Sequence, residues 1–174
     1  KYGIIYDAEF FRYLSEHADA LLRLDLETIA HVVARSCEIK AAVVSNDERE
    51  AGLRIILNFG HTLAHAIESE TNYQKYNHGE AVAIGMIGAA RLSRELGLID
   101  EAAVKAVKAI VRKFHLPVKA SGCTLEKMFE NISHDKKTVN GNVQWVLMNE
   151  IGKVQVDKNV PDILVKKVIA EILI

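Results

Sequence analysis

The sequence has few of the residues that support disulfide-rich or membrane-bound architectures. Its 174 residues include two cysteines, Cys37 and Cys123, which form no C-x-x-C pair. This spacing argues against both a disulfide framework and a cysteine zinc site. The longest run of small and apolar residues extends from Ala81 to Ala90 and is followed by Arg91, so it is well short of the roughly 20 residues of a membrane span. We therefore expect a cytoplasmic protein that does not enter a membrane.

Charge of a single sign is also missing. The chain has 22 basic and 23 acidic residues and a formal net charge of -1 at pH 7, so no basic field argues for nucleic acid or an anionic membrane. No P-loop, dinucleotide G-x-G-x-x-G fingerprint or serine-nucleophile elbow occurs in it. If a nucleotide cofactor takes part, its binding fold is expected outside this chain.

What remains is a strongly hydrophobic chain with helical periodicity. Hydrophobic residues make up 49% of it, enough for one core, so we expect a single helical domain over 1–174. The fold class is mainly α, with six to seven helices and one small β-hairpin. We expect helices near 7–22, 26–44, 54–68, 79–97, 100–114, 124–132 and 161–174, and hairpin strands near 143–148 and 154–156. The helix at 26–44 is apolar around much of its circumference, which predicts a central position.

Three histidines provide the most concentrated set of potential metal ligands. His61 and His65 are four residues apart, so on a helix both project from one face about 6 Å from each other, and Glu68 continues that face. His78 follows across a loop, as a third ligand does in many zinc sites. Spacing alone therefore predicts a three-histidine metal site. The alternative is that the histidines only hydrogen-bond in the core or lie in solvent.

The same predicted helix carries a polar stripe. Arg54, Asn58, His61 and His65 are separated by four, three and four residues, and apolar residues flank them. Such a stripe should be largely removed from solvent, so that its polar groups need a ligand as a partner. Gly60 supports this interpretation, because glycine within a helix costs about 1 kcal/mol without a visible structural gain.

Several lysines have ordinary explanations when they are considered alone. Lys40 ends an apolar face and is compatible with an aliphatic stem on the surface and an amine in water. Lys136 and Lys137 beside Asp135 are typical of a solvated turn. The position of Lys1 decides nothing by itself.

Taken together, these segments resemble the 3-dehydroquinate synthase family. The match runs from one end of the chain to the other in the order of the family, which makes it more specific than any single motif. The motifs that carry it are Lys1 to Ile5, Ser36 to Ala41, Asp47 to Arg54, Leu57 to Glu68, His78 to Met86, and Asp135-Lys136-Lys137.

The resemblance implies a helical C-terminal domain that lacks the N-terminal NAD-binding domain of the family. A chain that begins at Lys1 rather than methionine fits a piece of something longer. The resemblance also implies NAD and a divalent metal, zinc or cobalt, as cofactors. Metal ligands would be His61, His78 and a glutamate three residues before Lys1, outside this chain. His65 is then assigned to the substrate, in contrast to the three-histidine hypothesis.

The implied reaction converts 3-deoxy-D-arabino-heptulosonate 7-phosphate into 3-dehydroquinate and phosphate, a lyase step of the shikimate pathway of aromatic amino acid biosynthesis. Lys1, Lys40 and His65 would be catalytic. Substrate-binding residues would be Arg54, Asn58, His65 and one of Lys136 and Lys137. The full-length protein is expected to be a homodimer that binds a sugar-acid phosphate. The chain alone is expected to be inactive and to hold zinc weakly or not at all.

Two other classes remain open. The first is a related sugar-phosphate cyclase or a metal-dependent polyol dehydrogenase, an alternative favoured by Gln144 at a position where the family often has arginine. The second is a non-catalytic helical interaction module whose histidines are structural.

Overall fold

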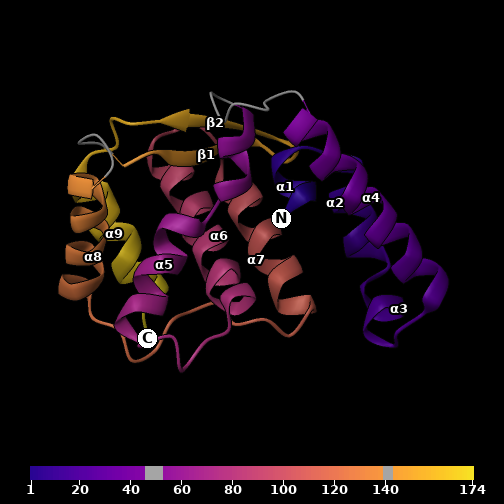
Figure 1. Cartoon of the computed structure of the whole chain (residues 1–174), viewed down its shortest axis with the longest axis horizontal. Helices are drawn as coiled ribbons and strands as arrows, with labels where there is room; N and C mark the ends of the chain where they lie inside the picture. The colour runs from indigo at the N-terminus through magenta and orange to yellow at the C-terminus, as the bar shows by residue number, and fades with distance from the viewer. Residues whose placement is uncertain (46–52, 139–142) are drawn as a thin grey trace.

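The computed structural model describes residues 1–45, 53–138 and 143–174, with only the backbone given for 53 and 135–138. Across these residues the chain forms nine α-helices, one 3-10 helix and one two-stranded antiparallel sheet (Figure 1). The prediction of a mainly α, multihelical fold with one hairpin is confirmed. The number of helices exceeds six to seven because short helices form near the N-terminus, where the predicted helix 7–22 divides at His17.

Helix α6 (His78–Glu95) lies at the centre of the molecule. Every residue from Ala81 to Ala90 is buried, which the alanines and glycines of this helix permit because small side chains let neighbouring helices approach closely. Asn77 and Glu80 start the helix with reciprocal side-chain bonds to backbone N–H groups. The neighbours of α6 are α5 (His61–Glu70), α7 (Glu101–Lys113), α9 (Asp162–Ile172) and β1 (Trp145–Glu150).

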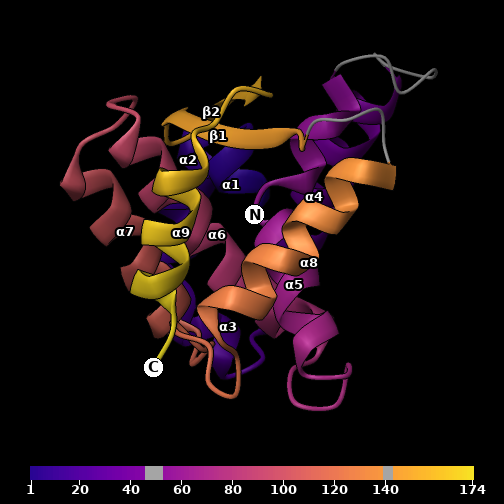
Figure 2. The same ribbon diagram turned by 90° about the vertical axis from the view of Figure 1, so that its left-hand side faces the viewer.

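The hairpin and α8 close two sides of this centre. Strand β1 pairs with β2 (Lys153–Asp157), and the hairpin lies across one end of the helices (Figure 1). Helix α8 (Leu125–Thr138) runs alongside α5 and also contacts α9 (Figure 2). The buried Ser93 hydroxyl accepts a hydrogen bond from the Met148 N–H at 2.8 Å, which joins α6 to β1.

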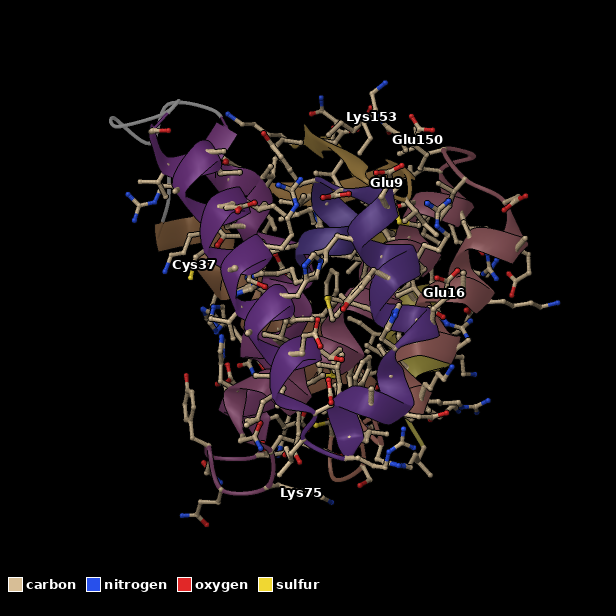
Figure 3. The ribbon with its side chains drawn as sticks, turned by 90° about the vertical axis from the view of Figure 1, so that its right-hand side faces the viewer. Glu9, Glu16, Cys37, Lys75, Glu150 and Lys153 are labelled. Atoms are coloured by element: carbon tan, nitrogen blue, oxygen red, sulfur yellow. The ribbon has the colours of Figure 1, made fainter. Side chains whose placement is uncertain are left out.

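A separate flank is formed by α1 (Tyr2–Ile5), α2 (Ala8–Glu16), α3 (Ala18–Leu22) and α4 (Leu26–Ser45). The prediction that the helix at 26–44 is central is wrong, because α4 lies at the edge of the molecule (Figure 1). Its apolar residues cover two faces, and only one face meets neighbours. Ile39 and Val43 are buried, whereas Leu26 and Val33 are 80% and 55% exposed. Figure 3 shows Cys37 on the side of α4 that faces away from α2.

The predicted helix over 54–68 is also wrong in its first half. Residues Leu53–Asn58 form the 3-10 helix η1, and α5 begins only at His61. Gly60 separates the two with φ of +82°, a left-handed conformation that favours glycine. A Cβ on Gly60 would lie 2.6 Å from the Met86 nitrogen, and a Cβ on Gly85 would lie 2.1 Å from the Gly60 oxygen. Glycine is therefore required at position 60 by the backbone conformation and the close packing on α6, contrary to our expectation that it brings no structural gain.

The helix predicted over 124–132 continues to Thr138, so Asp135, Lys136 and Lys137 lie on a helical backbone rather than in a turn. The predicted loop at 45–52 and the turn at 140–141 fall largely outside the described residues. Within residues 1–45, 53–138 and 143–174, no helix combines the length and apolarity needed to span a membrane.

Candidate active site

Three imidazole rings meet where α5 and α6 begin. His61 and His65 lie one turn apart on α5, and His78 is the first residue of α6. The ring centroids are 5.8 Å apart for His61 and His65, 5.4 Å for His61 and His78, and 5.9 Å for His65 and His78. The rings thus form a nearly equilateral triangle, and the structure brings together the three histidines that the sequence singled out.

A buried carboxylate lies behind two of these rings. The side chain of Glu68 is only 6% exposed, and its two oxygens contact different imidazoles. Oε2 lies 3.0 Å from Nδ1 of His65, and Oε1 lies 2.9 Å from Nδ1 of His78. The sequence placed Glu68 on the histidine face of α5 but assigned it no role. The contact could have been predicted from the position of Glu68 three residues after His65, because residues at this spacing are neighbours on a helix.

His61 is held differently and is kept neutral. Its Nδ1 donates to the Phe59 carbonyl oxygen at 3.3 Å. Burial, followed by the positive charge of Lys1, lowers the pKa of His61 to about 4, although the bond to Phe59 acts in the opposite direction. At pH 7 the ring is therefore uncharged, which is the form that binds a metal ion.

Two lysines share this electrostatic environment. Burial, and then the charge of Lys40, lowers the pKa of the Lys1 side chain below its ordinary value. Lys1 is half-buried beside the start of α1, and Lys40 is exposed on α4. Lys1 therefore acts electrostatically on His61 and is itself affected by Lys40, so positive charge gathers on this side of His61, which favours an anionic ligand.

The expectation that the polar stripe is removed from solvent is wrong. His65 and His78 are 58% and 57% exposed at the side chain, and Arg54 and Asn58 are exposed on η1. The reason is the break at Gly60, because no single helix aligns Arg54 and Asn58 with His61 and His65. The histidines instead line an open face of the chain.

Three further residues that the sequence singled out lie elsewhere. Lys136 and Lys137 belong to the last turn of α8, and their side chains are outside the described part of the structure, so their contact with substrate stays a prediction. Gln144 is half-buried immediately before β1.

The histidine geometry can be tested against a metal ion. Two imidazoles on one tetrahedral zinc, with Zn–N distances of about 2.0–2.1 Å, would place their centroids about 5 Å apart. The 5.4 Å separation of His61 and His78 fits this geometry best among the three pairs. Among the described residues, no group of three His, Cys, Asp or Glu side chains is arranged to hold a metal ion by itself. The pair thus fits two ligands of a site that needs another.

Solved structures with a similar fold define the class of protein. The chain matches 2-epi-5-epi-valiolone synthase from Streptomyces hygroscopicus subsp. jinggangensis, solved with NAD+ and Zn2+ bound, with a TM-score of 0.87 and 26% identity over 98% of this chain and 48% of that chain. It also matches 2-deoxy-scyllo-inosose synthase complexed with carbaglucose-6-phosphate, NAD+ and Co2+, with a TM-score of 0.71 and 29% identity over 84% of this chain and 41% of that chain. The fold is that of the helical part of the sugar-phosphate cyclases.

Sequence comparison gives the family. The family described as 3-dehydroquinate synthase C-terminal matches residues 1–138, and the chain belongs to it. The 3-dehydroquinate synthase of Shewanella sp. (strain MR-4) is 42% identical over 97% of this chain and 47% of the relative. That of Caldanaerobacter subterraneus subsp. tengcongensis is 47% identical over 90% of this chain and 44% of the relative. The chain spans about half the length of the curated relatives it matches.

Proposed function

We propose that this chain is the metal- and substrate-binding half of a 3-dehydroquinate synthase, which converts 3-deoxy-D-arabino-heptulosonate 7-phosphate into 3-dehydroquinate and phosphate in the shikimate pathway. The observation that carries the proposal is the meeting of His61 and His78, 5.4 Å apart between ring centroids, beside the exposed His65. The 42% and 47% identity to 3-dehydroquinate synthases supports this particular reaction.

His61 and His78 would hold a divalent metal, zinc or cobalt, through Nε2, together with a carboxylate from outside this chain. The neutral His61 and the bond from His78 to Glu68 support this role. The bound metal would supply Lewis-acid polarisation of a substrate oxygen, and NAD would supply reversible hydride uptake. NAD would be bound mainly by an N-terminal nucleotide-binding half outside this chain, and the solved cyclases that the chain resembles contain NAD+.

The cationic and polar residues of this chain would hold a doubly anionic sugar acid. Lys1, Lys40 and Arg54 supply positive charge for its phosphate and carboxylate groups, because hydrogen bonds between charged partners are the strongest that side chains form. Further donors come from the polar and basic residues Asn58, His65 and one of Lys136 and Lys137.

His65 would take part in proton transfer at the substrate, with Lys1 and Lys40 as further catalytic groups. Its exposed ring is backed by Glu68 and has one nitrogen directed away from that carboxylate. We also propose that the chain acts as one helical unit of a cytoplasmic homodimer and is inactive without the NAD-binding half.

Phosphate release tests this proposal. The Shewanella relative is 42% identical to this chain over the aligned residues. The chain should be joined to the N-terminal half of that relative and supplied with NAD, zinc and the heptulosonate phosphate. We expect release of phosphate without net accumulation of NADH. His61→Ala or His78→Ala should lower the rate by at least about 1,000-fold, since a lost ligand weakens the metal site sharply.

The matched control is His31→Ala, since His31 lies on α4, where its ring contacts Tyr13 at 4.4 Å between centroids and lies outside the histidine triangle. Its rate should stay close to that of the unchanged protein. A folded chimaera that binds NAD and zinc but releases no phosphate would exclude the proposal.

A second candidate is a related sugar-phosphate cyclase with another substrate, favoured by the match to 2-deoxy-scyllo-inosose synthase, which was solved with carbaglucose-6-phosphate, and by Gln144. Phosphate release from a hexose 6-phosphate instead of the heptulosonate would identify it. Net NADH accumulation from a polyol would instead identify a metal-dependent dehydrogenase. For a non-catalytic module, His61→Ala and His78→Ala should leave the metal content unchanged.

A further inference from the structure

We propose that Glu68 is a positioning residue that fixes the tautomers of His65 and His78. One carboxylate would hold the ring hydrogen of both imidazoles on Nδ1, which leaves Nε2 of each ring with the lone pair that a metal ion or a substrate proton requires. The tautomers are properties of this chain alone, whereas their importance for metal and substrate rests on the proposed function.

The burial of Glu68 provides the first argument. The residue is 4% exposed on α5, and it is one of three buried polar or charged residues in the described part of the chain. A buried carboxylate without partners is strongly destabilising. Both of its oxygens instead meet imidazoles, at 3.0 Å from His65 and 2.9 Å from His78.

Hydrogen-bond chemistry then assigns the tautomers. An ionised carboxylate only accepts hydrogen bonds, so the imidazole nitrogen facing it must carry the hydrogen. Nδ1 of His65 and Nδ1 of His78 both face Glu68, so both rings are Nδ1–H when neutral. The carbonyl oxygen of Phe59 imposes the same tautomer on His61. All three rings of the triangle therefore have an unprotonated Nε2.

The arrangement also couples two roles through one side chain. Glu68 contacts a candidate metal ligand, His78, and a candidate substrate residue, His65, whose rings lie 5.9 Å apart at an interplanar angle of 26°. A carboxylate behind a metal-binding histidine orients the ring and raises the basicity of its free nitrogen. Here the same carboxylate would do so for the neighbouring exposed ring of His65 as well.

Glu68→Gln separates this role from simple packing, because the amide has nearly the same shape but different hydrogen-bond chemistry. The amide oxygen can accept from one imidazole, while the amide nitrogen can only donate to the other. One of the two rings must then accept through Nδ1 and move its hydrogen to Nε2. That ring loses the free nitrogen it presents in the unchanged chain.

Long-range 1H–15N correlation spectra of the 174-residue chain, recorded at about pH 8.5, about two units above the ordinary imidazole pKa, report these tautomers directly. We expect Nδ1–H for both His65 and His78 in the unchanged chain. In Glu68→Gln one of them should change to Nε2–H. A ring of the unchanged chain found as Nε2–H would overturn the proposal, even if the variant failed to fold. Two unchanged rings in a folded Glu68→Gln would overturn it as well.

Glu70→Gln is the matched control. Glu70 lies on the same helix and accepts from the Thr124 N–H at 2.8 Å, away from the imidazoles. Its substitution should leave both tautomers unchanged, and a change there would show that Glu68 is not the specific cause.

Zinc competition with a chelator, in the chimaera with the NAD-binding half, provides the functional readout. Glu68→Gln should weaken zinc about 10–100-fold, as loss of an outer-shell partner does elsewhere, and Glu70→Gln should not. Equal zinc affinity in both variants would overturn the positioning role. If the tautomers are as expected but the unchanged chimaera releases no phosphate, the proposed function fails and the tautomer assignment stands.

Discussion

Asp7 shows how one side chain fixes the flank that holds Lys40. Its carboxylate accepts from the Phe10 N–H at 2.9 Å, which caps α2, and from Nε and one terminal nitrogen of Arg35 on α4 at 2.8 and 2.6 Å. Burial by itself raises the pKa of Asp7, but the bonds from Phe10 and Arg35 outweigh it and hold the pKa below the ordinary value. The α2–α4 contact is therefore sensitive to acid.

Asp7→Asn keeps an acceptor for the cap and removes the charge pair. Because the folded pKa is lowered, the stabilisation is fully present above the unfolded aspartate pKa of about 3.9 and is lost as the pH falls through the folded value. Urea unfolding should show a loss of about 1 kcal/mol at pH 7 and a smaller loss near pH 2.

Glu9→Gln is the control, because the Glu9–Arg12 pair is 3.8 Å long and its side chains are 89% and 67% exposed. It should change stability little at either pH. A difference between Asp7→Asn and the unchanged chain that stays constant from pH 7 to pH 2 would contradict the assignment.

The site residues illustrate what single-residue patterns can predict. The meeting of His61, His65 and His78 followed from helical spacing and one loop, because the three positions are close in sequence. The burial of Glu68 could not be predicted from this spacing, because it depends on the packing of α6 and its neighbours as well as on α5. The exposure of His65 was missed for the same reason.

Among the helices, the contact of α5 with α6 determines the geometry of the site. Gly60 precedes α5 and touches Gly85 of α6, so that the His61 end of α5 lies directly against the central helix. The sequence predicted both helices. It did not predict the left-handed conformation of Gly60, because the apolar spacing continues from η1 into α5 without a change. Periodicity reports which face is apolar and not where the backbone turns.

Gly85→Ala tests this contact. Its Cβ would lie 2.1 Å from the Gly60 carbonyl oxygen, so the backbone must move, and we expect a loss of about 3 kcal/mol in the free energy of unfolding. Gly79→Ala on the same helix is the control, because its Cβ would meet only the Asn77 Oδ1 at 3.5 Å. It should be neutral or stabilising by up to about 1 kcal/mol. Equal stability of the two variants in urea unfolding would contradict the close approach.

At the scale of the whole molecule, the sequence predicted the class of fold and the hairpin but misplaced one helix. Apolar residues around α4 predicted a centre, whereas the centre is α6, whose alanines and glycines permit neighbours on all sides (Figure 1). In the described structure, Leu26 and Val33 lie on a face of α4 that projects into solvent. Apolar composition shows that a face can be covered, and only the tertiary arrangement shows whether it is.

The central claim is that the histidine triangle divides by role, with His61 and His78 on the metal and His65 on the substrate. An anomalous difference map at the zinc edge, from crystals of the chimaera with the NAD-binding half, tests it most directly. We predict one peak within about 2.0–2.1 Å of Nε2 of His61 and Nε2 of His78, and no bond to His65. A zinc ion bonded to His65, or one bound away from both His61 and His78 in an active protein, would contradict the account.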